Sequence, residues 1–207
     1  AAGTAEDYRA RTAELETMRL ALAATHDAAA TDEARAIVLD HAREAVLVAM
    51  VDDLIPAWHG NPWDFNGTSE VPGQGHIACG YYVTTLLRDA GFRVERVRLA
   101  QQASENIIKT LVGEDRITRY RAQSSSHVTR AVAELGDGLY VVGLDIHVGL
   151  LVVEGGTARF CHASYLDPVA AVCESPRTAP AFLSGYRVVG KLLDDPMMEA
   201  WLEGEAF

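Results

Sequence analysis

The N-terminal part of the chain has the hydrophobic spacing of two amphipathic helices. Apolar residues recur about every 3.6 positions over residues 5–25 and again over residues 31–55, among many Ala, Glu and Arg residues. Thr31 stands where an N-terminal cap is expected, and Pro56 follows the last apolar position of the second pattern. The spacing therefore predicts a helical hairpin.

A third helical stripe begins at Cys79. It follows a loop over residues 57–77 that is dense in Gly, Pro, Asn and Asp. Gly91 comes directly after the stripe, at the position that favours a left-handed cap. Cys79 therefore lies in the first turn of a predicted helix, on the side that meets the core. The stripe consists of Cys79, Tyr82, Val83, Leu86, Leu87 and Ala90.

The second half of the chain changes to alternating patterns. Residues 92–100 predict a short strand, and residues 101–112 and 126–135 predict helices. Helices first and antiparallel strands afterwards are typical of the α+β class. The later predicted strands are LYVVGL (139–144), IHVGLLVV (146–153), TARFCHA (157–163) and GYRVVGKLL (185–193).

These patterns divide the chain into a helical extension over residues 1–56 and one α+β domain over residues 57–207. We expect the hairpin to pack on the domain, and the alternative is an arm that binds a partner. Within the domain, the helix that starts at Cys79 is expected to pack on an antiparallel sheet.

Charge and hydropathy exclude several partners. The chain has 207 residues and a net charge of -11, without basic clusters, so we expect no nucleic acid or anionic membrane as a partner. No apolar run approaches the roughly 18 residues of a membrane span. The chain begins AAGTAED, without Met. We expect an exported protein, periplasmic or secreted, whose signal peptide has been removed, with the cytoplasm as the alternative.

The cysteines are few and widely spaced. Cys79, Cys161 and Cys173 do not form a disulfide framework by spacing, and no C-x-x-C pair suggests a zinc or redox centre. We therefore expect no metal and no cofactor.

The predicted position of Cys79 suits a nucleophile. Unpaired backbone N–H groups and the positive end of the helix dipole surround a side chain in the first helical turn. They favour thiolate over thiol, so we expect a lowered pKa for the Cys79 thiol. The same N–H groups could hold the oxyanion that forms when sulfur attacks a carbonyl. A packed structural cysteine is the alternative.

Two histidines are predicted to lie on one face of a β-hairpin. Gly155 and Gly156 are typical of a two-residue turn, and this turn pairs Gly149 with His162. His147 then becomes the diagonal neighbour of His162, with open space over Gly149. We expect this face to cover the Cys79 helix, and Cys161 to point to the opposite face, away from both histidines.

A thiol, a base and an orienting group together make a nucleophilic triad. We expect Cys79 to be the nucleophile, His147 the base in mid-strand, and His162 the group that orients His147.

Six segments of the domain resemble, in order, the motifs of the NlpC-type cysteine peptidases, a papain-like family. The resemblance covers about residues 57–193 and leaves the two N-terminal helices outside. The segments are GNPWDFNG (60–67), ACGYYVTTLLRDAGF (78–92), GDGLYVV (136–142), HVGLLVV (147–153), HAS (162–164) and GYRVVGKLL (185–193).

The resemblance implies a papain-like fold and the same catalytic set: Cys79 as nucleophile, His147 as base and His162 as third polar residue. Papain-like enzymes keep an oxyanion-hole Gln before the cysteine, and Gln74 stands near that place. We expect Gln74, Trp63 and Tyr81 to contact the substrate.

Two positions depart from the family. Its Asp and Ser on either side of the cysteine are Ala78 and Gly80 here, which puts the recognition of a peptidoglycan stem peptide in doubt. The expected function is a thiol-dependent amide hydrolase, a peptidase for cell-wall or related peptides, which works through an acyl-enzyme. The alternatives are a papain-like acyltransferase and a binding module on the same scaffold.

Overall fold

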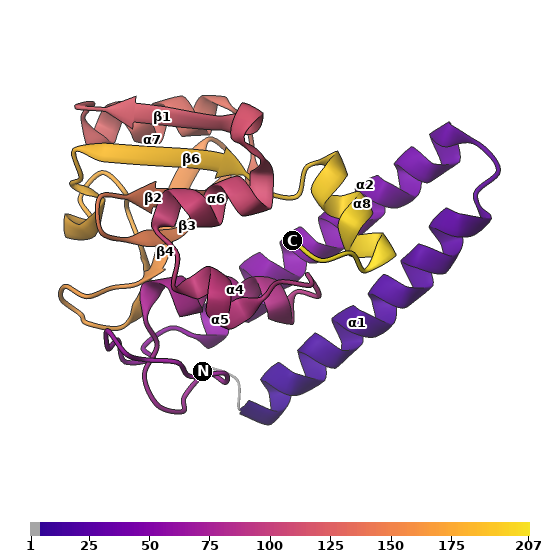
Figure 1. Ribbon diagram of the computed structural model, residues 1–207, viewed down its shortest axis with the longest axis horizontal. Helices are drawn as coiled ribbons and strands as arrows, with labels where there is room; N and C mark the ends of the chain where they lie inside the picture. Colours follow the sequence, from indigo (N-terminus) through magenta and orange to yellow (C-terminus); the bar gives the residue numbers. More distant parts are fainter. Residues whose placement is uncertain (1–4) are drawn as a thin grey trace.

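The structure, a computed structural model, describes residues 5–207. Residues 1–4, which belong to the expected helical extension and to the end expected after signal-peptide removal, lie outside the described residues. It has the α+β class predicted from the sequence, with helices on both faces of an antiparallel sheet (Figure 1). The α-helices are α1 (Ala5–Ala28), α2 (Asp32–Val48), α3 (Ile55–Ala57), α4 (Cys79–Asp89), α5 (Arg96–Ala100), α6 (Ser104–Val112), α7 (Ser125–Glu134) and α8 (Asp195–Glu203).

The sheet has six antiparallel strands in the order β1-β6-β2-β3-β4-β5. Antiparallel pairing of β2, β3 and β4 follows from their tight turns, because short connections join neighbouring antiparallel strands. The strands are β1 (Ile117–Arg121), β2 (Gly138–Leu144), β3 (Val148–Glu154), β4 (Thr157–Ala163), β5 (Ala171–Glu174) and β6 (Tyr186–Lys191).

The two edge strands were missed by the sequence analysis. β1 is only partly buried and lacks a clear alternation, and β5 has four residues. β1 pairs with β6, which lies far along the chain. β5 pairs with β4, from which a loop separates it. Short edge strands depend on such pairing, so their own residues carry a weak signal.

The predicted strand over residues 92–100 is wrong, because α5 lies there. Arg96, in the middle of this segment, is buried. The Arg96 guanidinium donates to Thr85 Oγ1 at 2.7 Å, which holds this turn of helix against α4. The alternation of apolar and charged residues covers only residues 92–95 and stops at Arg96, so it is too short to specify a strand.

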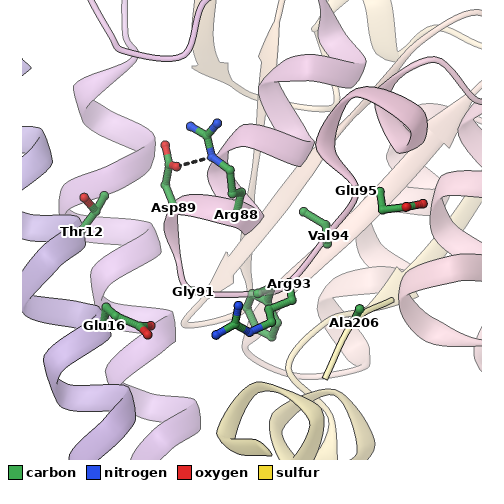
Figure 2. Close-up of a pocket in the computed structure, with 10 residues that line it drawn as sticks. Thr12, Glu16, Arg88, Asp89, Gly91, Arg93, Val94, Glu95 and Ala206 are labelled. Carbon is green, nitrogen blue, oxygen red and sulfur yellow. Dashed lines mark hydrogen bonds and ion pairs between the residues drawn. The ribbon is translucent and has the colours of Figure 1, made fainter. Parts of the chain in front are cut away.

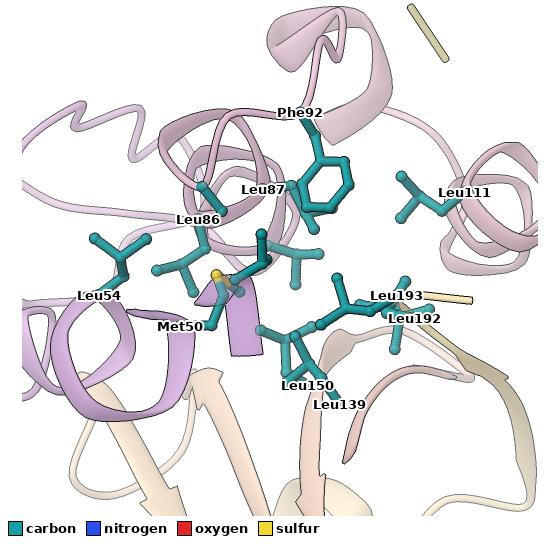
Figure 3. Close-up of a cluster of buried hydrophobic side chains, with 14 of the residues drawn as sticks. Met50, Leu54, Leu86, Leu87, Phe92, Leu111, Leu139, Leu150, Leu192 and Leu193 are labelled. Atoms are coloured by element: carbon teal, nitrogen blue, oxygen red, sulfur yellow. The ribbon is translucent and has the colours of Figure 1, made fainter. Parts of the chain in front are cut away.

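The N-terminal hairpin shares its core with α4. α2 leads without a break through a π-helical turn (Ala49–Leu54) into α3, so the helix passes Pro56 and is capped at Trp58. Met50 and Leu54 meet Leu86 and Leu87 in one apolar cluster (Figure 3). α1 and α2 also contact α8, far from the sheet in Figure 1.

Hydrogen bonds also join the hairpin to the domain. Tyr8 donates its hydroxyl proton to Asp89 at 2.8 Å, and Trp58 Nε1 donates to the Tyr8 hydroxyl at 3.1 Å. Arg19 donates to the backbone oxygens of Trp201 and Leu202, both at 3.2 Å. Residues 5–57 are therefore packed on the domain through buried polar as well as apolar contacts.

Candidate functional site

Cys79 is the first residue of α4, as its sequence pattern predicts. Ala78 caps the helix in an extended conformation without a side-chain hydrogen bond, so the first backbone N–H groups are left for other acceptors. The backbone amides of Val148, Gly80 and Cys79 lie near the sulfur and favour its thiolate form. Cys79 thus lies between the start of α4 and the start of β3.

The thiol pKa differs from the sequence-based expectation. Burial raises the pKa of the Cys79 thiol above its ordinary value, although the surrounding amides act in the opposite direction. The sequence predicts the favourable helix start, but it does not show how far the sulfur is removed from water. Cys79 is therefore a neutral thiol in this state.

His147 precedes β3 and is not in mid-strand as expected. The Leu144 amide donates to the His147 carbonyl at 2.8 Å, so a two-residue turn delivers the histidine to the beginning of the strand. The His147 side chain is 3% exposed. Burial lowers its pKa to about 4, because the charged imidazolium would lose its hydration.

The hairpin register is confirmed. Leu151 faces Phe160 and Glu154 faces Thr157, which is the pairing that the Gly155–Gly156 turn predicts. His147 Nε2 lies 2.7 Å from His162 Nδ1. Burial and the neighbouring His147 lower the pKa of His162 to about 3.

The space over Gly149 is not open, in contrast to the expectation. A Cβ at this position would lie 2.6 Å from the Phe160 ring and 2.9 Å from His162 Cβ. The Phe160 and His162 rings stack there, with centroids 4.1 Å apart. Glycine is required because the two rings fill the place of a side chain.

The sheet face that carries His162 does not cover the Cys79 helix, so this expectation is wrong. Leu151 and Phe160 on the histidine face belong to the cluster of Val128 and Val132 in α7. The opposite face packs on α4, through Val148, Leu150, Val152 and Cys161. His147 lies just before the start of β3, and Val148, the first residue of that strand, is on the face that packs on α4.

Cys161 points away from the histidines, as predicted, but it forms a disulfide with Cys173. The two residues are directly paired across β4 and β5. The sequence analysis did not find this bond because β5 was not identified. The disulfide links the strand of His162 to the strand that carries Glu174.

Glu174 is a site residue that the sequence analysis missed. Its Oε1 lies 3.0 Å from His162 Nε2. His162 pairs with Val172, so Glu174 is its diagonal neighbour on the same face. Residues His147, His162 and Glu174 therefore form a continuous hydrogen-bonded row across three strands or strand ends.

This row assigns the ring protons. A carboxylate at Glu174 accepts a hydrogen bond from His162 Nε2–H, so a neutral His162 has its lone pair on Nδ1. His147 must then donate from Nε2 to that lone pair. Its own lone pair is left on Nδ1, which is the form that can take a proton from a thiol.

Cys79 and His147 line the same cavity of about 600 Å³. Trp63 and Tyr81, both expected to contact the substrate, line it as well. The lining is completed by Phe65, Asn66, Thr68, Ala78, Gly80, Ala100, Gln101, Gln102, Ile146 and Tyr165.

Gln74 is not brought to the cavity. It is exposed in the loop before α4, and its carbonyl accepts from the Ser69 hydroxyl. Gly73 and Gly75, on either side of Gln74, both have positive φ, and Gln74 is absent from the cavity lining. The backbone amides of Cys79 and Gly80 are the donors next to the sulfur, so an oxyanion site does not require Gln74.

Two further cavity residues were missed. The Tyr165 ring centroid lies 5.2 Å from that of His147 and 6.1 Å from that of Trp63, so Tyr165 contacts both residues. Gln101 Nε2 donates to the Tyr81 hydroxyl at 3.2 Å. Tyr165 follows directly on the HAS segment, which is the only signal that could have indicated it.

Arg96 fixes one wall of the cavity. Its guanidinium donates to the Thr68 and Ser69 carbonyls at 3.0 and 2.8 Å and lies over the Tyr81 ring, 4.8 Å from the centroid. The loop before α4 is thereby tied to the helix that Cys79 opens. A buried cation that donates several hydrogen bonds rigidifies its surroundings.

A second cavity, of about 560 Å³, lies between α1 and the end of α4 (Figure 2). It contains charged side chains, including the Arg88–Asp89 ion pair. Its lining contains no cysteine or histidine.

Over residues 5–207, no helix is long and apolar enough to cross a membrane, and no cluster of three or more His, Cys, Asp or Glu side chains could hold a metal ion. No family model, curated protein or solved structure matches the chain. The site therefore has to be interpreted from its own geometry.

The buried histidines predict a pH dependence of stability. Unfolded histidines bind protons as the pH falls through about 6.5, whereas His147 and His162 in the folded state do so only near 4 and 3. The unfolded state therefore binds more protons in this window. The free energy of unfolding should fall as the pH is lowered, by up to about 1.4 kcal/mol per pH unit for each histidine.

Urea denaturation between about pH 5 and pH 7 measures this effect. His162→Gln should reduce the slope, and His127→Gln, an exposed position on α7, should leave it unchanged. A slope that is the same in all three proteins would contradict the burial of His162 as a neutral ring.

Proposed function

We propose that this chain is a thiol-dependent amide hydrolase with a papain-like arrangement, related to the NlpC-type cysteine peptidases. The observation that carries the proposal is the row from Glu174 through His162 to His147, which ends at the cavity of Cys79. It leaves His147 neutral, with a fixed ring orientation and a lone pair available. These are the properties of a general base.

Acylation begins when His147 Nδ1 takes the proton of the Cys79 thiol and the sulfur attacks the amide carbonyl carbon. The carbonyl oxygen becomes an oxyanion, for which the Cys79 and Gly80 amides are the nearest donors. When the C–N bond breaks, the imidazolium gives its proton to the leaving nitrogen. An acyl-enzyme and a free amine result.

Deacylation uses the same base. His147 takes a proton from water, the oxygen attacks the thioester carbonyl, and the C–S bond breaks. The proton returns to the Cys79 sulfur, and the carboxylic acid leaves. His162 and Glu174 keep His147 in one orientation and stabilise its positive charge while the proton resides there.

One observation favours the binding module as a second candidate. Burial raises the pKa of the Cys79 thiol, so the sulfur is not a thiolate before the substrate arrives. Hydrolysis therefore depends on proton transfer during attack, whereas a binding module needs none. The two functions differ in whether Cys79 becomes acylated.

An activated acyl donor tests the proposal. Wild-type protein incubated with p-nitrophenyl acetate should show a burst of p-nitrophenol and a mass increase of one acetyl group, located on Cys79. Cys79→Ser should show neither. Cys161 and Cys173 serve as internal controls, because their disulfide leaves Cys79 as the free thiol of the described chain. Equal acetylation of the wild type and Cys79→Ser would refute the proposal.

A further inference from the structure

The cavity at Cys79 differs from other cavities of the molecule in charge. Its lining contains no Asp, Glu, Lys or Arg, although these residues make up 23% of the chain. Three other cavities all contain charged side chains, and the ion pair in Figure 2 is an example. The uncharged lining is therefore a local property of the Cys79 cavity.

Burial shifts His147 and Cys79 in this lining toward their neutral forms. Burial lowers the pKa of His147 to about 4 and raises the pKa of the Cys79 thiol. An ammonium or carboxylate group that entered the cavity would lose hydration and find no opposite charge among the lining residues. Such a group is costly to bury without a partner.

Two exposed apolar side chains stand at the same cavity. Phe65 is 77% exposed and Ile146 is 78% exposed, and both belong to the lining. Phe65 comes from the loop before α4, and Ile146 from the turn between β2 and β3. Exposed apolar side chains that gather at a cavity from separate loops are typical of a surface that an apolar ligand covers.

The rest of the lining is aromatic or neutral and polar. Trp63 and Tyr165 supply aromatic surface beside His147. Asn66, Gln101 and Gln102 can hydrogen-bond an amide without contributing charge. A mainly apolar lining with a small number of polar groups is typical of a small-molecule site.

We propose that the site takes amides or esters of uncharged, apolar acyl groups, aliphatic or aromatic, and discriminates against acyl groups that carry a carboxylate or ammonium. This inference rests on the proposed function for its chemistry, while the preference itself is a property of binding. It also distinguishes this site from one for charged peptide stems, because Ala78 and Gly80 beside the nucleophile add no carboxylate.

Binding is tested without turnover in the Cys79→Ser variant. Three anilides of similar length are titrated and followed by NMR: caproyl anilide, adipoyl monoanilide with a terminal carboxylate, and ε-aminocaproyl anilide with a terminal ammonium. The neutral anilide should bind at least about tenfold more tightly than either charged one. Equal or tighter binding of a charged anilide would overturn the inference.

Turnover is measured separately with the p-nitrophenyl esters of the same three acids. Wild-type kcat/KM should rank the caproyl ester first by a similar factor. If no ester acylates Cys79 but the neutral anilide is preferred, the proposed function fails and the preference stands. If Cys79 is acylated without any preference among the three esters and anilides, the proposed function stands and the preference for uncharged acyl groups fails.

Variants of Phe65 and Ile146, the two exposed apolar residues at the cavity mouth, test whether these side chains cause the preference for uncharged acyl groups. Phe65→Ser and Ile146→Ser should raise KM for the caproyl ester several-fold with little change in kcat. Leu183→Ser is the matched control, since Leu183 is also an exposed apolar residue, at 67%, but does not line the cavity. An equal effect of all three substitutions would contradict a role for the cavity mouth.

Discussion

Replacing His147 by alanine is expected to lower the rate of Cys79 acylation by about 10²- to 10⁴-fold, the range that general-base catalysis contributes. The loss should be large because the Cys79 thiol is neutral and cannot rely on a resting thiolate. The attacking sulfur must give up its proton during the reaction, and His147 is the histidine that shares its cavity. The measurement is the burst rate with p-nitrophenyl acetate at pH 7.

Two controls separate this effect from misfolding. His127→Ala removes an exposed histidine of α7 and should leave the rate unchanged. Iodoacetamide should still alkylate Cys79 in His147→Ala once the pH exceeds the thiol pKa, which shows that the sulfur remains accessible. A loss of less than about tenfold in His147→Ala would mean that another group acts as base.

Replacing Glu174 by alanine is expected to lower the acylation rate about 10- to 100-fold, a size typical for losing the partner that orients a functional histidine. Without the carboxylate, a neutral His162 can carry its single ring proton on either nitrogen. His147 then loses the acceptor that keeps its own proton on Nε2. A fraction of His147 consequently presents a proton, and no lone pair, to the thiol.

Glutamine is the informative second substitution. The carbonyl oxygen of Glu174→Gln can still accept from His162 Nε2, so this variant should keep more activity than Glu174→Ala. Glu154→Ala is the matched control, because Glu154 at the end of β3 pairs with Arg159, away from the site. Equal losses in the alanine and glutamine variants would argue against the hydrogen bond as the cause.

The ring protons provide a readout that is independent of activity. ¹⁵N NMR of the histidines should find both His147 and His162 protonated on Nε2 at neutral pH in the wild type, and a mixture in Glu174→Ala. A wild-type His147 protonated on Nδ1 would contradict the proton arrangement, even if the enzyme were active.

Several parts of the site could be predicted because their causes are local. Two adjacent glycines determine a hairpin turn, and the turn sets the pairing of β3 with β4. His147 and His162 become neighbours by that pairing alone. The start of α4 at Cys79 likewise follows from a short apolar stripe with a glycine at its end.

Other parts could not be predicted because they depend on contacts between distant segments. Glu174 and the Cys161–Cys173 disulfide both require β5, a four-residue strand that exists through its pairing with β4. The false strand at 92–100 and the choice of Gln74 have the same origin. The strand was inferred from the local residue pattern and Gln74 from its position before Cys79, while burial of Arg96 and the course of the loop determine the outcome.

The amino-acid sequence by itself determined the α+β class, the helix that begins at Cys79 and the register that joins the two histidines. These features arise from spacing over a few residues, where backbone geometry allows few alternatives. The tertiary structure decided which sheet face meets α4, how far Cys79 and His147 are removed from water, and which side chains line their cavity. Burial and hydrogen-bond partners set the pKa of each group, and they exist only once distant segments have packed together.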